Sequence, residues 1–151
     1  MKILLIEDDE HKWERLKNFL ESTLEFPELI LAKSVQEGLT SLRHFVPDLM
    51  VLDMSLPVFT YSAKEQGFQH SSYAGKDILE HLFHFDINVP VIIFTAFDRF
   101  GDDNNAVTLS ELDLEFKRDY PEQYVGCVWY NSLEDGWQDE LLKLINQKFK
   151  I

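Results

Sequence analysis

The 151-residue chain has one cysteine, no long apolar run and few basic residues, and each shortage excludes a class of protein. Cys127 is the one cysteine and lies in an apolar stretch, so no disulfide can form within the chain and a reducing compartment is expected. The apolar runs stop well short of the ~20 residues that a membrane helix requires. Met1-Lys2 leads directly into an apolar run that ends in acids, unlike a secretory signal. We therefore expect a cytoplasmic protein that does not contact a membrane.

Positive charge is also scarce, because 14 Lys and Arg face 27 Asp and Glu and leave a formal net charge of −13. Proteins that bind nucleic acid gather Lys and Arg to neutralise phosphates, and no such basic cluster occurs in this sequence. We therefore expect no direct contact with nucleic acid. Other proteins are the expected partners, and Mg²⁺ is the expected ion.

The sequence contains no glycine-rich phosphate-binding fingerprint, internal repeat, low-complexity tract or interdomain linker, so residues 1–151 are predicted to form a single domain. It does contain strand-sized apolar runs that alternate with amphipathic stretches. Strands are predicted at 2–6, 29–32, 49–52, 89–95 and 124–130. Helices are predicted over 10–24 and 75–85, and after the capping motifs that begin at Ser34, Thr108 and Ser132.

This alternation predicts an α/β fold with a parallel sheet between two layers of helices. The short chain favours a flavodoxin-like (βα)5 three-layer sandwich with strand order 2-1-3-4-5. In that order the first, third and fourth strands are neighbours.

Acids and a hydroxyl follow these three strands where each of them ends. Glu7 and Asp8 follow the first strand, Asp53 follows the third, and Thr95 ends the fourth. Because parallel sheets bind ligands at the carboxyl ends of their strands, these residues predict one carboxylate pocket. Asp8 and Asp53 could hold Mg²⁺, and Asp53 could act as a nucleophile that forms an aspartyl phosphate. The Thr95 hydroxyl and backbone N–H groups would hold the phosphoryl oxygens.

These residues resemble the receiver domain of bacterial response regulators, through the motifs Glu7-Asp8, Asp53 four residues before Pro57, and Thr95-Ala96. The resemblance implies that Asp53 is the phosphoacceptor and receives its phosphoryl group from a sensor histidine kinase. Thr95 would be the switch hydroxyl, and Ala96 the small residue that leaves room for the phosphoryl group. The implied Mg²⁺ ligands are Glu7, Asp8, Asp53 and the backbone carbonyl of Ser55.

The chain departs from the receiver pattern at the end of the fifth strand, where receivers carry a lysine that pairs with the phosphoryl group. Tyr130 or Asn131 stands there, and neither side chain is positively charged. The absence of this lysine removes a charge-assisted contact worth roughly 1.5–3 kcal/mol. Its absence would slow phosphorylation or uncouple phosphorylation from the signal to the effector. Three other cations could take its place: Lys64, Lys76 or Arg99.

Two insertions, 58–74 and 97–107, also depart from the pattern and flank the expected pocket. The first is rich in aromatic residues, which either fold back on the body or offer a surface to a partner: Phe59, Tyr61, Phe68 and Tyr73.

The predicted function is that of a stand-alone receiver in two-component signalling, which accepts a phosphoryl group on Asp53 in a Mg²⁺-dependent reaction. Its partners would be a sensor histidine kinase and a protein effector, with a homodimer left open. Its only chemistry would be self-phosphorylation and autodephosphorylation, with no cofactor besides Mg²⁺. One alternative is a pseudo-receiver, an interaction module that is never phosphorylated. Another is a Mg²⁺-dependent phosphohydrolase, which is disfavoured because Ser55 stands where such enzymes commonly carry an acid.

Overall fold

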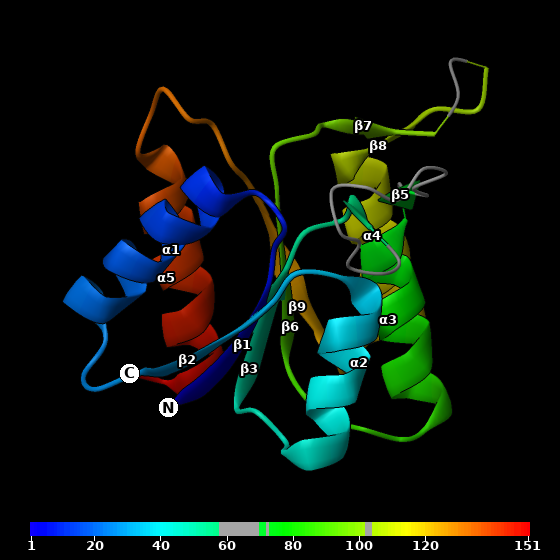
Figure 1. The fold of residues 1–151 in the computed structure, drawn as a ribbon. Coiled ribbons are helices and arrows are strands. Elements are labelled where there is room, and N and C mark those ends of the chain that lie inside the picture. The colour runs from blue at the N-terminus through cyan, green and yellow to red at the C-terminus, as the bar shows by residue number, and fades with distance from the viewer. Residues whose placement is uncertain (58–69, 72, 102–103) are drawn as a thin grey trace, which may run out of the picture.

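The computed structural model describes residues 1–57, 70–71, 73–101 and 104–151, and its centre is a five-stranded parallel sheet (Figure 1). The strands run in the order β2-β1-β3-β6-β9. Their bounds are β1 Lys2–Ile6, β2 Glu28–Ala32, β3 Leu49–Leu52, β6 Val91–Thr95 and β9 Tyr124–Trp129. Numbered along the chain as strands of this sheet, they follow the order 2-1-3-4-5. The predicted flavodoxin-like arrangement is therefore confirmed.

Helices cover both faces of the sheet and make it the middle layer of three (Figure 1). One face carries α1 (Glu10–Thr23) and α5 (Gly136–Phe149). The other face carries α2 (Val35–His44), α3 (Ala74–His84) and α4 (Leu109–Asp119). Among the described residues, no helix has both the length and the apolar character needed to cross a membrane.

The core consists of two apolar clusters, one on each face of the sheet. In β1 the side chains alternate, so that Leu4 and Ile6 join the cluster under α2, α3 and α4. Ile3 and Leu5 join the cluster under α1 and α5. All four side chains are 0% exposed. A strand buried on both faces must be apolar at every position, which explains the continuous apolar runs in the sequence.

Polar side chains begin several helices. Ser34 and Thr108, where the sequence predicts caps, each accept the backbone N–H three residues later, and Asp9 does the same for α1. The predicted cap at Ser132 is wrong, because α5 begins only at Gly136 and Asp135 makes no side-chain capping bond. The carbonyl of Ser132 instead accepts a hydrogen bond from Arg15, and a turn lies between β9 and α5.

Two short antiparallel ribbons, which the sequence did not predict, lie beyond the carboxyl ends of the strands (Figure 1). One pairs β4 (Leu56–Pro57) with β5 (His70–Ser71), and the other pairs β7 (Arg99–Phe100) with β8 (Val107–Thr108). The Tyr73 hydroxyl lies 3.4 Å from the carbonyl oxygen of Phe100 and donates to it. Tyr73 thus packs onto the body, whereas three aromatic residues of the first insertion lie outside the described residues: Phe59, Tyr61 and Phe68.

Cys127 in β9 is predicted to be a slowly reacting thiol. Burial and the nearby Asp113 carboxylate raise the pKa of this thiol to about 11, so the reactive thiolate is rare at neutral pH. We expect iodoacetamide to alkylate the folded protein at pH 7.5 at least about a hundredfold more slowly than an unperturbed thiol of pKa ~8.5. Intact-mass spectrometry over time measures the rate, and the urea-unfolded chain is the control. Equal rates in the folded and unfolded chain would contradict the prediction.

Candidate functional site

Three carboxylates meet at the carboxyl edge of the sheet. Glu7 and Asp8 follow β1 and Asp53 follows β3, which pairs in parallel with β1 so that Ile6 lies beside Leu52. Each of the three acids offers an oxygen, and these oxygens lie within 4.8 Å of one another. Glu7 and Asp53 are buried, whereas Asp8 is exposed. Strand pairing therefore places the acids together, as the sequence predicts.

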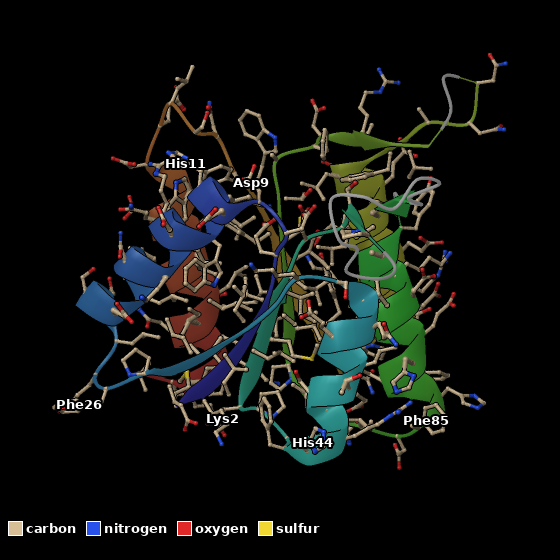
Figure 2. All side chains as sticks on the ribbon, viewed as in Figure 1. Lys2, Asp9, His11, Phe26, His44 and Phe85 are labelled. Atoms are coloured by element: carbon tan, nitrogen blue, oxygen red, sulfur yellow. The ribbon has the colours of Figure 1, made fainter. Side chains whose placement is uncertain are left out.

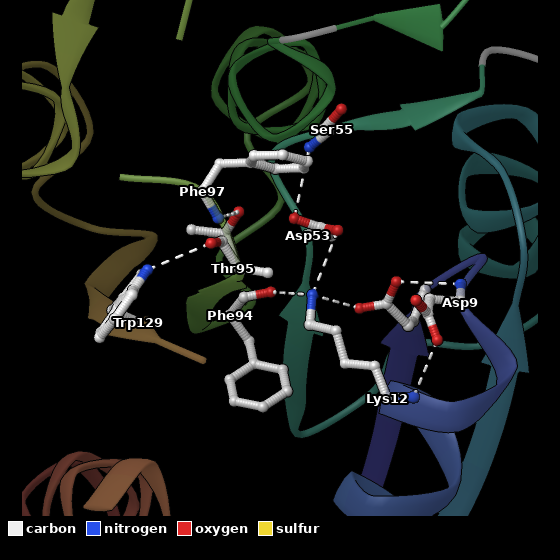
Figure 3. A network of polar contacts seen from close by, with 10 residues as sticks. Asp9, Lys12, Asp53, Ser55, Phe94, Thr95, Phe97 and Trp129 are labelled. Atoms are coloured by element: carbon white, nitrogen blue, oxygen red, sulfur yellow. Dashed lines mark hydrogen bonds and ion pairs between the residues drawn. The ribbon is translucent and has the colours of Figure 1, made fainter. Parts of the chain in front are cut away.

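The other predicted site residues lie at the same edge. Thr95 ends β6 with its side chain fully buried, and its Oγ1 accepts a hydrogen bond from the Phe97 N–H at 3.4 Å. The Ser55 N–H donates to Oδ1 of Asp53 at 3.4 Å (Figure 3). Beside them is a cavity of about 360 Å³, whose lining residues are Asp8, Asp9, Lys12, Asp53, Ser55, Ala96 and Phe97.

A cation that the sequence analysis did not predict lies among these acids. The ammonium nitrogen of Lys12 is 2.5 Å from Oε1 of Glu7 and 3.1 Å from Oδ2 of Asp53. It also donates to the backbone carbonyl of Phe94 at 2.9 Å (Figure 3). The ammonium group thus forms ion pairs with two carboxylates and donates a hydrogen bond to one backbone carbonyl. Lys12 is only 3% exposed.

Helix α1 brings Lys12 into the site. Lys12, Leu16 and Leu20 are its buried residues, and their spacing of four places them on one face. The ammonium group lies 5.0 Å from the centre of the Phe94 ring and 5.8 Å from that of Tyr130. In the sequence Lys12 is in line with Leu16 and Leu20 shortly after the acidic pair, but nothing within the helix alone marks it as buried.

Burial and neighbouring charges shift the pKa values of two groups in the site, Glu7 and Lys12. Burial raises the pKa of Glu7 to about 7, with the negative charge of Asp53 adding to the rise and Lys12 opposing it. Burial alone would lower the pKa of Lys12, but the Asp53 and Glu7 carboxylates outweigh it and raise that pKa. Lys12 therefore stays protonated at neutral pH and supplies a fixed positive charge.

Two of the three cations proposed from the sequence are described by the structure, and neither of them makes these contacts. Lys76 pairs with Glu115 at 3.7 Å, Arg99 is exposed on β7, and Lys64 lies outside the described residues. At the end of β9 the Tyr130 hydroxyl accepts a hydrogen bond from Arg15, and Oδ1 of Asn131 accepts the Leu133 N–H. Among the described residues, the cation that contacts Asp53 comes from α1.

This arrangement of acids on a five-stranded parallel sheet is that of a signalling receiver, and the comparisons with known proteins agree. The sequence model of the response regulator receiver domain matches residues 3–117, so the chain belongs to this family. It is 27% identical to the Detocs response regulatory protein DtcB of Enterobacter cloacae, over 97% of this chain and 99% of that protein. It is 28% identical to the uncharacterized protein y4jR of Sinorhizobium fredii, over 91% of this chain and 92% of that protein.

Solved receiver domains share the fold. The receiver domain of the Francisella response regulator 1452 matches with a TM-score of 0.63 and 21% identity, over 99% of this chain and 96% of that one. A CheY-like receiver domain protein of Methanospirillum hungatei matches with a TM-score of 0.62 and 19% identity, over 99% and 93%. Receiver domains are in general signalling modules of two-component systems rather than enzymes. They typically take their signal from histidine kinases and bind Mg²⁺ at an acidic pocket.

Proposed function

We propose that the protein accepts a phosphoryl group on Asp53 from a sensor histidine kinase and passes the signal on by contact with an effector protein. The observation that carries this proposal is the position of the Asp53 carboxylate, which borders a cavity of about 360 Å³ beside two further acids. Carboxylates act as nucleophiles in forming aspartyl phosphates. We place this activity in the cytoplasm and in a single receiver unit that spans residues 1–151.

Mg²⁺ is the proposed ion, and the donor set suits it. Three carboxylates offer oxygens within 4.8 Å of one another, and hard oxygen ligands are those that Mg²⁺ prefers. Glu7, Asp8 and Asp53 would hold the ion together with the backbone carbonyl of Ser55. When bound, Mg²⁺ offsets the negative charge that gathers as a phosphoryl group approaches the acids.

Protein groups around the cavity would position the phosphoryl group. The Thr95 hydroxyl ends the strand beside Asp53 and would donate a hydrogen bond to a phosphoryl oxygen. Ala96 lines the cavity, and its methyl side chain leaves space for the group.

The effector protein would bind the surface next to Ala96. The indole N–H of Trp129 donates to the Ala96 carbonyl at 3.1 Å, and Trp129 is 46% exposed (Figure 3). A change at Ala96 would therefore reach a large exposed aromatic side chain.

Incubation with acetyl phosphate and Mg²⁺ tests the proposal. We expect intact-mass spectrometry to show the gain of one phosphoryl group, and Asp53→Asn to abolish it. Asp48→Asn is the matched control, because Asp48 is exposed and precedes the same strand at its opposite end. An adduct that survives in Asp53→Asn would overturn the assignment of the acceptor.

The pseudo-receiver is a second candidate, and one observation favours it. The Lys12 ammonium group pairs with both Glu7 and Asp53 and offsets part of their mutual repulsion, which favours an interaction module that needs no phosphorylation. That function predicts no adduct and no Mg²⁺-dependent change in Trp fluorescence. Catalytic turnover of phosphate esters would instead indicate the phosphohydrolase.

A further inference from the structure

We propose that Lys12 on α1 supplies the positive charge that receivers ordinarily place at the end of their last strand. Its ammonium group would hold the Asp53 carboxylate before phosphoryl transfer and would donate to a phosphoryl oxygen afterwards. This inference rests on the proposed function, because it assigns a partner to the phosphoryl group on Asp53.

The contacts of Lys12 place it at the reacting atoms. Its three acceptors belong to the ends of three neighbouring strands, namely Glu7 after β1, Asp53 after β3 and Phe94 in β6 (Figure 3). The ammonium group is 3.1 Å from Oδ2 of Asp53, which is one of the two oxygens that can attack phosphorus. A lysine held only for packing would not need contact with the acceptor carboxylate.

Lys12 also lies between the acceptor and the end of the last strand. It lines the cavity of about 360 Å³ beside Asp53 and a second one of about 420 Å³ bounded by Trp129, Tyr130 and Asn131. Among the described residues that line the two cavities, Lys12 is the one cation. A charge on α1 thus reaches the region that a lysine at position 131 would serve. Figure 2 shows α1 beside the sheet with Asp9 at the start of the helix.

The surroundings hold the ammonium group in a fixed position. Its stem is buried with Leu16 and Leu20 on one helix face, and the Phe94 and Tyr130 rings lie within 5.0 and 5.8 Å of the nitrogen. A charge held in place beforehand stabilises developing negative charge more effectively than a mobile surface lysine.

The reaction requires no proton transfer from Lys12. An oxygen of Asp53 attacks phosphorus, the bond from phosphorus to the donor oxygen or nitrogen breaks, and its electron pair leaves with the donor. The negative charge that was on Asp53 is then carried by the phosphoryl oxygens. Lys12 keeps its proton and redirects one N–H from Oδ2 to a phosphoryl oxygen.

Relocating the charge tests the proposal. We expect Lys12→Met to form the acetyl phosphate adduct at least about tenfold more slowly, the size of one lost charge-assisted contact. Adding Asn131→Lys to Lys12→Met should restore most of the rate, because the charge returns to the end of the last strand, at one of the two positions where receivers carry their lysine. Lys17→Met is the matched control, since Lys17 lies on the same helix above the Trp13 ring. It should react as the unmodified protein does.

The lifetime of the adduct is a second readout, and circular dichroism confirms the folding of each variant. If Lys12→Met does not fold, Lys12→Gln takes its place, because its amide can still donate to Glu7 and to the Phe94 carbonyl. A folded Lys12 variant that reacts as fast as the unmodified protein, or faster, overturns this inference while the proposed function stands. A slow variant that Asn131→Lys does not rescue assigns Lys12 a structural role and also overturns it. If the unmodified protein forms no adduct, both fail.

Discussion

Lys12→Met is expected to lower the free energy of unfolding by about 3–5 kcal/mol when no divalent cation is present. The substitution leaves the buried carboxylates of Glu7 and Asp53 side by side without the ammonium group that lies 2.5 and 3.1 Å from them. Urea denaturation in the presence of EDTA, followed by circular dichroism, measures the loss. Lys17→Met should cost less than about 1 kcal/mol, because a cation–π contact at an accessible site is worth roughly that much.

The free energy of unfolding that Lys12→Met loses should depend on pH and on Mg²⁺. The pKa of Glu7 is about 7 in the folded protein, above the ordinary value of 4.5. Between pH 4.5 and pH 7 the folded state therefore binds more protons than the unfolded state, and the stability of the protein falls as the pH rises through this range. Removing Lys12 raises that pKa further, and the destabilisation should be smaller at pH 5.5 than at pH 8. Mg²⁺ should restore part of the stability, since an ion that binds only the folded state stabilises it. A variant as stable as the unmodified protein at pH 8 in EDTA would contradict the prediction.

Phe94→Ala is expected to destabilise the fold by a similar amount, about 3–5 kcal/mol, through loss of packing rather than charge. The Phe94 side chain is 1% exposed, and its ring centre lies 5.2 Å from those of both Tyr130 and Trp137. The urea midpoint gives the loss, and the near-ultraviolet circular dichroism of the aromatic cluster should weaken. Phe83→Ala is the control, because Phe83 is 60% exposed and should change stability by less than about 1 kcal/mol. Equal effects of the two substitutions would show that the ring cluster adds no stability.

The fold was predictable because the three central strands, β1, β3 and β6, are buried on both faces. A strand such as Val91–Thr95 must then be apolar throughout, and such runs are visible in the sequence between amphipathic helices. The acids of the site were predictable for the related reason that Glu7 and Asp53 interrupt this pattern at strand ends. By contrast, the two-residue strands of the ribbons are too short to carry any period, and they escaped prediction.

Lys12 escaped prediction for a different physical reason. Charged residues on helices usually face water, and the sequence of this helix offers an apolar stripe without Lys12, namely Trp13, Leu16, Leu20 and Leu24. The structure instead buries Lys12, Leu16 and Leu20, with Trp13 only half-buried. What makes the burial of a lysine favourable is the pair of carboxylates supplied by two other strands, and no local pattern in the helix reveals them. The sequence analysis sought a replacement for the charge missing at Tyr130 or Asn131 in Lys64, Lys76 or Arg99, and not on α1.

The contact between Lys12 and the Phe94 carbonyl joins residues 82 positions apart, which bears on the order of events during synthesis. A ribosome releases β1 and α1 long before β6, so the nascent chain carries Glu7, Asp8 and Lys12 without the strand that completes their surroundings. Contacts between distant residues form late because the intervening chain must first be ordered. The site that we propose for phosphoryl transfer would therefore be complete only when the sheet closes around it.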